Sequence, residues 1–413
     1  MTGFAFVGGR LTCDGLDVAD IAAATGTPFF IYSAGRIRDA FNQLDDAFAS
    51  YPHAIHYALK ANSTLAIVRL VRHLGAHADA NSLGEIDVAL RAGFEPSEIV
   101  FTGVGKTRDE LARAIGLGVR AINVESNGEA ARIDALAQSK GVRARVAVRV
   151  NPDIDPQTHQ HISTGVRASK FGVPIDHVPA LLRELARRPG LEPVGLHVHL
   201  GSQIRDMVPI ARAARVLADL AIDARDAGIR LEHLDLGGGL GISYDGSPAP
   251  SPATYAGAIL PAVRDSGLHL LLEPGRVLVA SAGALVGSVA DIKAFSGAPS
   301  FLVLDTGMTE LIRPMLYDAF HRIEAVVPRG GPEAVFDVVG PLCETSDTLG
   351  RDRTFGPVEV GDLVAVFDTG AYGIVMASNY NRRCMPPEVL VDNGGWRITR
   401  RRQTIEDMLR LEQ

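Results

Sequence analysis

The sequence predicts an α/β protein in which a (β/α)8 barrel is followed by a smaller all-β domain. Three observations support this prediction. Between about residues 50 and 280, short apolar runs alternate with amphipathic stretches, giving about eight β–α units, the number that closes a barrel. Residues suited to chemistry recur where these runs end. Beyond residue 280 the pattern changes to short strand-like runs between Gly and Pro turns.

Each predicted barrel strand is a short apolar run bounded by turn residues. The runs are residues 56–60, 77–80, 99–102, 121–125, 145–150, 195–199, 233–236 and 270–273. Helical spacing of apolar residues predicts helices between them, as at 107–116 and 210–227.

A doubly wound open sheet is the competing arrangement, because it is built from the same β–α units. An open sheet gathers its ligand residues at one switch point, whereas a barrel builds its site from the ends of several strands. In this chain the candidate residues are spread over different strand ends: Lys60, Asp79, Glu125, His199, Gly237 to Gly239 and Glu273. This distribution favours the barrel.

The second domain is predicted from strand-like runs at residues 301–305, 334–339, 363–367 and 388–392. The N-terminal segment 4–12 also reads as a strand, and we expect it to join this domain because chain termini often meet. The expected boundaries place the barrel at residues 25–280 and a β-sandwich or barrel-like domain at 1–24 with 281–413.

Composition narrows the class of protein. The 413 residues are 46% hydrophobic and carry a formal charge of −7, which gives no support for nucleic-acid or anionic-membrane binding. No apolar run reaches the ~18 residues typical of a membrane span, and no signal peptide is evident. Cys13, Cys343 and Cys384 are far apart and odd in number, so we expect a reducing, cytoplasmic setting without a disulfide framework.

Lys60 is the first candidate for chemistry, because it lies in YALKAN at the end of an apolar run. Desolvating an ammonium is costly, and it lowers the pKa of the amine. A neutral amine can attack a carbonyl and form a Schiff base. The alternative without a chemical role is a lysine whose alkyl chain packs at a strand end while its ammonium group reaches water.

His197 and His199 alternate along the next strand of interest, so they lie on one face. We expect no metal site there, because no suitably placed Cys or carboxylate completes the ligand set. An imidazole could instead lie flat on a planar cofactor ring, with Ser202 reaching a phosphate. A satisfied core histidine remains open for His197.

Two further motifs suit a cofactor. The glycines at 237–239 let backbone N–H groups approach a phosphate, although their spacing is not that of a dinucleotide-binding loop and a tight turn would also explain them. Glu273 ends the last apolar strand and needs a cationic partner, either Arg276 or a protonated pyridine nitrogen. The second partner would make the cofactor an electron sink.

Together these residues identify the chain as similar to the fold-type III pyridoxal-phosphate-dependent decarboxylases, and within them to the diaminopimelate decarboxylase family. The resemblance spans nearly the whole chain. It rests on motifs read directly from the sequence: YALKAN at 57–62, NSLGE at 81–85, HISTG at 161–165, SKFG at 169–172, HLGSQ at 199–203, GGGLG at 237–241, EPGR at 273–276, LIRP at 311–314, GPLCETSD at 340–347, GAYG at 370–373 and SNYN at 378–381.

The resemblance implies a cofactor, pyridoxal 5'-phosphate, and a role for each matching residue. Lys60 would hold the cofactor covalently, His199 would stack on its ring, and Glu273 would pair with the ring nitrogen. Cys343 would return a proton to the substrate Cα, and it would reach the site with Glu344 from the other subunit of an obligate homodimer. The cofactor-binding set also includes Asp79, Ser202, Gly239, Gly275, Arg276 and Tyr372.

The resemblance further implies decarboxylation of meso-2,6-diaminopimelate to L-lysine and CO2, the last step of lysine biosynthesis. The far end of this substrate carries a carboxylate and an ammonium, and the residues expected around it are Arg276, Arg313, Tyr317, Glu344 and Tyr372. An arginine left unpaired by a substrate without that carboxylate would cost on the order of 3 kcal/mol, roughly a hundredfold in rate.

Alternatives stay open at this point. The chain could decarboxylate ornithine, arginine or carboxynorspermidine, act as an alanine racemase, or carry the cofactor without catalysis. Ser346, where glycine is common in the family, leaves room for a shifted substrate. Residues 153–165 are expected to form a mobile loop over the site, although His159 and His161 could suggest a metal.

Overall fold

The computed structural model describes residues 2–156, 165, 169–294 and 299–412. It divides into two compact units. The barrel unit comprises Phe41–Ile242 and Pro248–Val277, and the β unit comprises Met1–Ala40, Ser243–Ser247 and Leu278–Gln413. The loop expected at residues 153–165 falls mostly outside the described residues, and so do His159 and His161.

The barrel unit is a closed ring of parallel strands. Each strand pairs with the next one along the chain, and pairing of β13 with β5 closes the ring. The open-sheet alternative is therefore excluded. The eight strands are β5 His53–Ala58, β6 His77–Ala80, β7 Ile99–Phe101, β8 Ala121–Val124, β9 Ala144–Asn151, β11 Leu191–His197, β12 His233–Asp235 and β13 His269–Leu272, and a short β10, Val173–Pro174, adds to β9.

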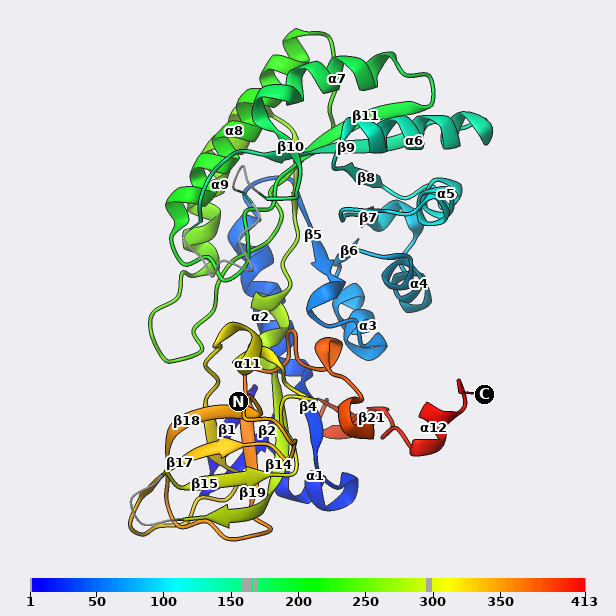
Figure 1. Ribbon diagram of the computed structural model, residues 1–413. Helices are drawn as coiled ribbons and strands as arrows, with labels where there is room; N and C mark the ends of the chain where they lie inside the picture. Colours follow the sequence, from blue (N-terminus) through cyan, green and yellow to red (C-terminus); the bar gives the residue numbers. More distant parts are fainter. Residues whose placement is uncertain (1, 157–164, 166–168, 295–298, 413) are drawn as a thin grey trace. The chain divides into compact units, whose positions relative to one another are not determined.

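Helices follow the strands and cover them from outside, as α3 to α6 do beside β5 to β8 in Figure 1. Ser82, Thr107 and Ser126 cap three of these helices, because the side-chain oxygen of each accepts a backbone N–H of the first turn. The helices are α2 Ala34–Phe48, α3 Leu65–His73, α4 Leu83–Ala92, α5 Arg108–Leu117, α6 Asn127–Ser139, α7 Val178–Arg187, α8 Met207–Asp226, α9 Pro252–Ser266 and α10 Arg276–Val279.

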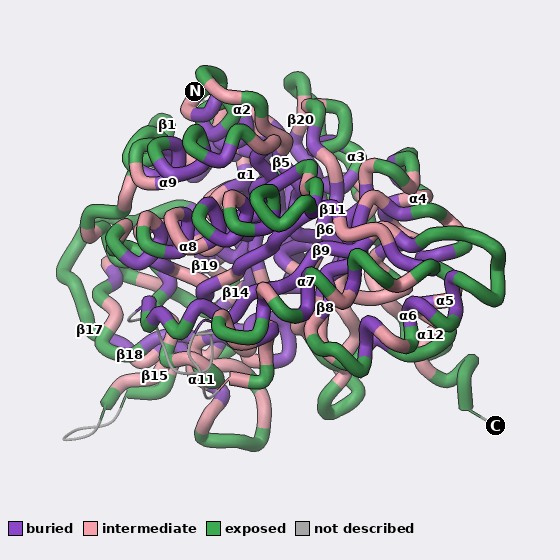
Figure 2. The backbone as a smooth tube through the Cα atoms, turned by 90° about the horizontal axis from the view of Figure 1, so that it is seen from above, coloured by how far each residue is buried: buried purple, intermediate pink, exposed green. Residues whose placement is uncertain are grey.

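Burial follows the pattern that the sequence predicts. Strands β6, β9 and β11 run as buried segments in Figure 2, whereas α8 alternates between buried and exposed positions. Six of the eight barrel strands end one or two residues earlier than expected, whereas β6 ends as expected and β9 ends one residue later. Strand β5 stops at Ala58, and Lys60 lies in a following 3-10 turn, η1 Leu59–Ala61, whose Leu59 and Ala61 are buried. Chemistry-bearing residues thus lie at or just beyond the strand ends, at the face where barrels build their sites.

The β unit contains a nine-stranded sheet and a separate three-stranded one. The large sheet comprises β4 Phe29–Ser33, β14 Gly283–Lys293, β15 Phe301–Leu304, β16 Ile323–Ala325, β17 Ala334–Val339, β18 Thr348–Phe355, β19 Leu363–Phe367, β20 Glu388–Asp392 and β21 Gly395–Arg400. Among the described residues, the helices that lie wholly within the β unit are α1 Val18–Thr25, α11 Arg313–Tyr317 and α12 Ile405–Leu409. Among the described residues, no helix combines the length and apolarity needed to cross a membrane.

The expectation of one strand at residues 4–12 was wrong. The segment is a hairpin of β1 Phe4–Val7 and β2 Arg10–Cys13, to which β3 Leu16–Asp17 adds. Gly8 and Gly9 have φ of +58° and +78°, so they form the turn that the strand pattern concealed. Leu11 and Cys13 of this hairpin pack in one apolar cluster with residues of the large sheet such as Phe367.

Candidate active site

Lys60 and Asp79 meet at the ends of two neighbouring strands. The Lys60 Nζ donates to Asp79 Oδ2 at 3.2 Å, and the Lys60 side chain keeps a third of its surface exposed while Asp79 is fully buried. Burial raises the pKa of Asp79, and the negative charge of Glu273 adds to this effect, while Lys60 opposes it. The amine is thus anchored yet reachable, as a nucleophile must be.

Glu273 directly follows β13 and is almost fully buried. Its Oε2 lies 3.2 Å from His197 Nε2, and its Oε1 accepts from the Thr102 hydroxyl at 3.5 Å. Burial alone would raise the pKa of Glu273. The charge and hydrogen bond of His197, helped by Lys60 and His199, instead bring this pKa below its usual value. Glu273 is therefore a buried anion, which suits a protonated ring nitrogen.

His197, Asp235 and Glu273 form a buried trio that the sequence analysis missed. One ligand-type atom from each lies within 4.8 Å of the others. The expectation that no carboxylate stands beside these histidines was therefore wrong for His197. The trio has the residue types of a cation site, but His197 and Glu273 already satisfy each other by a hydrogen bond. Burial, reinforced by Glu273, raises the pKa of Asp235 well above its usual value, so the trio is suited to holding protons.

Only local signals could have indicated this trio in the sequence. His197 alternates with His199, and Asp235 comes directly before the glycine loop. Thr102 and Asn123 carried no signal at all. Asn123 Nδ2 donates to Thr102 Oγ1 at 2.9 Å, which leaves the Thr102 proton for Glu273. Glu125, also expected at this face, accepts a hydrogen bond through Oε1 from Arg149 Nη1 at 2.7 Å.

His199 is held as a neutral ring. The Gly238 backbone N–H donates to His199 Nδ1 at 3.2 Å. Loss of water around the ring lowers the pKa of His199 well below its usual value, and the nearby positive charge of Lys60 lowers it further. A neutral imidazole with a fixed edge can present its flat face to a planar ligand.

The glycines after β12 form a cradle that a side chain would fill. A Cβ at Gly238 would overlap the Glu273 carbonyl oxygen, and one at Gly239, where φ is +101°, would lie 2.5 Å from the Gly201 carbonyl oxygen. A Cβ at Gly275 would lie 2.9 Å from Ala61 Cβ. Arg276 Nη2 donates to Ser202 Oγ at 2.7 Å on the same face. Such glycine-lined backbone suits a phosphate.

These features fit the cofactor that the resemblance implies. The barrel unit brings an amine, a buried carboxylate, a neutral imidazole and a glycine cradle to one end of the barrel. All eight barrel residues named for the cofactor lie there: Lys60, Asp79, His199, Ser202, Gly239, Glu273, Gly275 and Arg276. The other five site residues, Arg313, Tyr317, Cys343, Glu344 and Tyr372, belong to the β unit.

Arg313 begins α11 and is nearly fully buried. Its Nη1 lies 2.6 Å from His321 Nε2, and its guanidinium carbon lies 4.8 Å from the centre of the Tyr244 ring. Arg313 is therefore a buried arginine with defined partners and not a solvent-exposed one. Tyr317 ends the same short helix.

Cys343 and Glu344 are exposed on a loop that Asp347 organises. Asp347 accepts from the backbone N–H groups of Met308 and Leu342 at 2.6 and 2.8 Å. Glu344 accepts from the hydroxyls of Tyr380 at 2.6 Å and Ser346 at 3.1 Å. Ser346 therefore gives Glu344 a hydrogen bond that glycine at this position would lack.

Tyr372 has a φ of +58°, which is strained for a residue with a side chain. A Cβ at the preceding Gly370 would overlap the Val279 carbonyl oxygen, and one at Gly373 would lie 2.6 Å from the Thr369 carbonyl oxygen. The close packing of these glycines holds the strained turn. Strain of this kind is typical of functional sites.

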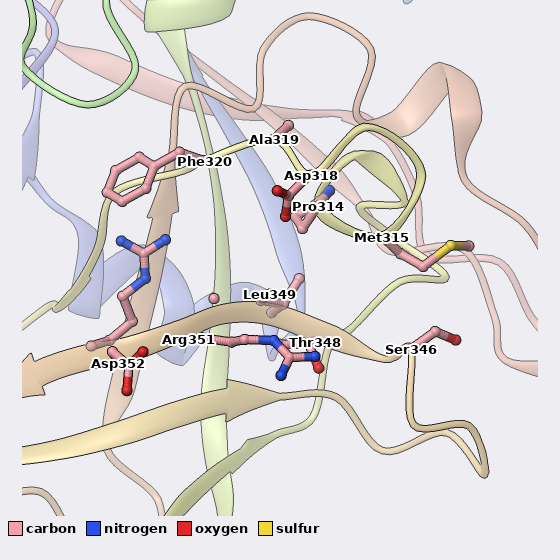
Figure 3. A pocket seen from close by; sticks show the side chains of 12 residues that line it. Pro314, Met315, Asp318, Ala319, Phe320, Ser346, Thr348, Leu349, Arg351 and Asp352 are labelled. Carbon is pink, nitrogen blue, oxygen red and sulfur yellow. The ribbon is translucent and has the colours of Figure 1, made fainter. Parts of the chain in front are cut away.

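A hollow of about 620 Å³ lies in the β unit between α11 and β18. Figure 3 shows Met315 and Phe320 on one side of it and Ser346 and Arg351 on the other. Its lining lacks Arg313, Tyr317, Cys343 and Tyr372, so the hollow is separate from the residues expected to do chemistry.

Comparison with known proteins agrees with this geometry. Residues 34–280 match the family described as "Pyridoxal-dependent decarboxylase, pyridoxal binding domain". The diaminopimelate decarboxylase of Pseudomonas aeruginosa is 41% identical over 408 residues, covering 99% of this chain and 98% of the relative. That of Neisseria meningitidis serogroup A is 42% identical, covering 97% and 98%.

Two solved structures are similar over nearly the whole chain. The Helicobacter pylori diaminopimelate decarboxylase complexed with L-lysine has a TM-score of 0.93 and 39% identity, covering 96% of this chain and 99% of that one. The M. jannaschii diaminopimelate decarboxylase in co-complex with L-lysine has a TM-score of 0.95 and 36% identity, covering 100% and 99%.

Proposed function

The chain belongs to the diaminopimelate decarboxylases, a family of pyridoxal-dependent decarboxylases, and we propose that it converts meso-2,6-diaminopimelate into L-lysine and CO2. The observation that carries this proposal is the cluster at the barrel end. An anchored amine, Lys60, shares that end with a buried carboxylate, Glu273, whose pKa is held low against burial.

Pyridoxal 5'-phosphate, when bound, supplies an electron sink for the pair of electrons released as the Cα–carboxylate bond breaks. Lys60 would hold it covalently through Nζ. The glycine cradle with Ser202 and the backbone of Arg276 would bind its phosphate, and His199 would support its ring. Glu273 would keep the ring nitrogen protonated, because a carboxylate without water around it strongly favours an adjacent cation. Asp79 keeps the Lys60 amine at the strand ends.

The proton step needs a donor after CO2 has left. We assign it to Cys343, whose Sγ–H would transfer its proton to the substrate Cα and recover one from water. Cys343 must stay a free thiol for this, and a reducing compartment such as the cytoplasm supplies that condition.

We further propose a homodimer in which Cys343 and Glu344 of each copy complete the site of the other. Cys343 is exposed on its own chain, as a residue presented to a second copy must be. Large apolar side chains are exposed on the same unit, and a dimer contact would cover them: Met315, Leu316, Phe320 and Tyr380.

The distal end of the substrate is the basis of specificity. Arg313, together with Arg276 and Tyr372, would bind the carboxylate that remains in the product, while Glu344 would bind the ammonium and Tyr317 would line the space. A substrate without that carboxylate would leave a buried guanidinium without its anion. The expected discrimination is roughly a hundredfold.

The test is CO2 release by the cofactor-loaded protein with meso-diaminopimelate, L-lysine, L-ornithine and L-arginine side by side. Turnover of diaminopimelate at least about a hundredfold above the others supports the proposal. Preferred turnover of another amino acid would keep the chemistry of Lys60 and Glu273 but overturn the distal assignments. Release of no CO2, with racemisation or cofactor binding alone, would overturn the proposed reaction.

A further inference from the structure

His321 is a fully buried titratable side chain to which the proposed reaction gives no role. It lies just beyond α11, in the β unit. Its Nδ1 is 2.7 Å from the Phe367 carbonyl oxygen, and its Nε2 is 2.6 Å from Arg313 Nη1. Both ring nitrogens are therefore engaged, one with the sheet and one with the guanidinium.

The chemistry of these partners fixes the state of the ring. A carbonyl oxygen only accepts hydrogen bonds, so Nδ1 must carry a proton. A guanidinium only donates, so Nε2 must be without one. His321 is thus neutral and in a single tautomer. It acts as a rigid acceptor that ties Arg313 to strand β19, in which Phe367 lies.

Tyr244 holds the same guanidinium through its ring face. The Arg313 guanidinium carbon lies 4.8 Å from the Tyr244 ring centre, and the Tyr244 and His321 rings meet edge to face at 5.3 Å and 73°. Tyr244 comes from Ser243–Ser247, a short segment of the chain that packs with the β unit. The two aromatic residues thus hold Arg313 by a hydrogen bond and a cation–π contact.

Both contacts orient the arginine without neutralising its charge. The carboxyl of Asp368 also acts on Arg313, but Arg322 and Arg36 act on the same carboxyl. Burial raises the pKa of Asp368 to about 6 in spite of these three arginines. Asp368 therefore does not act on Arg313 alone.

We propose that His321 and Tyr244 are positioning residues that hold Arg313 where it binds the distal carboxylate of the substrate and of the L-lysine product. This inference rests on the proposed function. It assigns specificity to two residues that would not touch the reacting atoms.

The test compares two competitive inhibitors of the cofactor-loaded dimer. L-Lysine has the distal carboxylate, and cadaverine is the same diamine without it. In His321→Ala we expect the Ki of L-lysine to rise about tenfold or more, while that of cadaverine changes less than about twofold. His321→Gln should recover part of the loss, because its carboxamide oxygen can accept from Arg313.

Tyr244 gives an independent pair of variants. Tyr244→Leu removes the ring face and should raise the Ki of L-lysine by about threefold to tenfold. Tyr244→Phe keeps the ring face, so its Ki should stay near that of the wild type. His177→Ala, at an exposed histidine of the barrel unit, is the matched control. The absorption spectrum of the bound cofactor should remain unchanged in all of these variants, because its proposed ligands lie elsewhere.

An equal rise in the Ki of both inhibitors in His321→Ala and Tyr244→Leu would show general damage and overturn the inference. Unchanged Ki values for both inhibitors would overturn it as well. If the wild-type enzyme turns over diaminopimelate while the variants show either of these outcomes, the proposed function still stands. A wild-type enzyme that does not turn it over, or binds cadaverine as well as L-lysine, would overturn the proposed function and this inference with it.

Discussion

Glu273 is the residue at which burial and charge oppose each other most directly. Water-free surroundings favour its neutral acid, whereas His197 at 3.2 Å and Lys60 favour its anion. The pKa below its usual value means that the anion prevails. The residue is therefore built to stabilise a positive charge placed beside it.

Glu273→Gln tests this role. The amide has the same shape but no charge, so it cannot keep a ring nitrogen protonated. We expect kcat to fall by roughly 10² to 10³, the cost of removing one preorganised charged group, with a smaller change in KM. Steady-state CO2 release measures the effect. Glu273→Asp, which keeps the charge, should retain more activity, and a Gln variant with nearly wild-type kcat would contradict the assignment.

The limits of sequence reasoning are visible at this same residue. Glu273 was identified because its motif is local, as were Lys60 and His199. Its partner Thr102 lies 171 positions away in the sequence, and no local pattern links the two. His197 was left open for a similar reason. A hydrogen bond across a closed barrel depends on how strands are placed around the ring, which one sequence does not show.

At the scale of elements, the order and type of the barrel strands were predicted correctly, because short continuous apolar runs report burial on both faces of a strand. The ends were predicted less well. Lys60 lies in the 3-10 turn η1 beyond β5. Leu59 and Ala61 of that turn are apolar and buried, so in the sequence they resemble a continuing strand. The hairpin at the N-terminus was missed because Gly8 and Gly9 were read as part of a strand.

The glycine loop after β12 gives a prediction at this scale. A methyl group at Gly238 would overlap the Glu273 carbonyl oxygen, which is backbone and cannot move aside alone. We expect Gly238→Ala to lower the free energy of unfolding by about 1 to 3 kcal/mol and to weaken cofactor binding. Chemical denaturation and a cofactor titration measure the two effects.

Gly257→Ala is the matched control for this substitution. Gly257 lies inside α9, and nothing lies within 4 Å of the position that its Cβ would take. The same change should therefore stabilise the protein by about 0.5 to 1 kcal/mol and leave cofactor binding unaltered. If the two variants had the same unfolding free energy and cofactor affinity, the close approach of Gly238 to the Glu273 carbonyl oxygen would not explain the glycine at this position.

For the whole molecule, acid stability depends on buried histidines. Burial lowers the pKa of His233 from the usual 6.5 to about 3, with further lowering by Arg120 and Arg145. Neither ring nitrogen of His233 has a hydrogen-bond partner among the described residues, which agrees with a neutral ring. Between these two pH values the unfolded chain binds a proton at this position that the folded chain does not bind.

Stability from His233 is therefore fully present above pH 6.5 and declines as the pH falls toward 3. The slope is about 1.4 kcal/mol per pH unit, or about 2 kcal/mol between pH 6.5 and 5. His233→Gln cannot titrate, so the difference in unfolding free energy between wild type and variant should shrink by that amount over this range. Urea denaturation at several pH values measures it, and a constant difference would show that His233 binds its proton equally in the folded and unfolded protein.

The proposed dimer makes the last prediction, because it divides one site between two chains. Lys60→Ala removes the amine from the barrel unit, and Cys343→Ala removes the proton donor from the β unit, so each variant alone should lose most activity. Cys343→Ala should lose about 10² to 10⁴ in kcat, the usual contribution of a positioned acid. Mixing the two after dissociation and reassociation would place half of the molecules in heterodimers.

Each heterodimer would contain one site with both substitutions and one with neither, since its sites are formed reciprocally by the two copies. The mixture should therefore recover about a quarter of wild-type activity. If each chain instead built a complete site from its own Lys60 and Cys343, every site in the mixture would carry one substitution, and no activity would return. Recovery on mixing thus separates a shared site from two independent ones, whatever the size of either single loss.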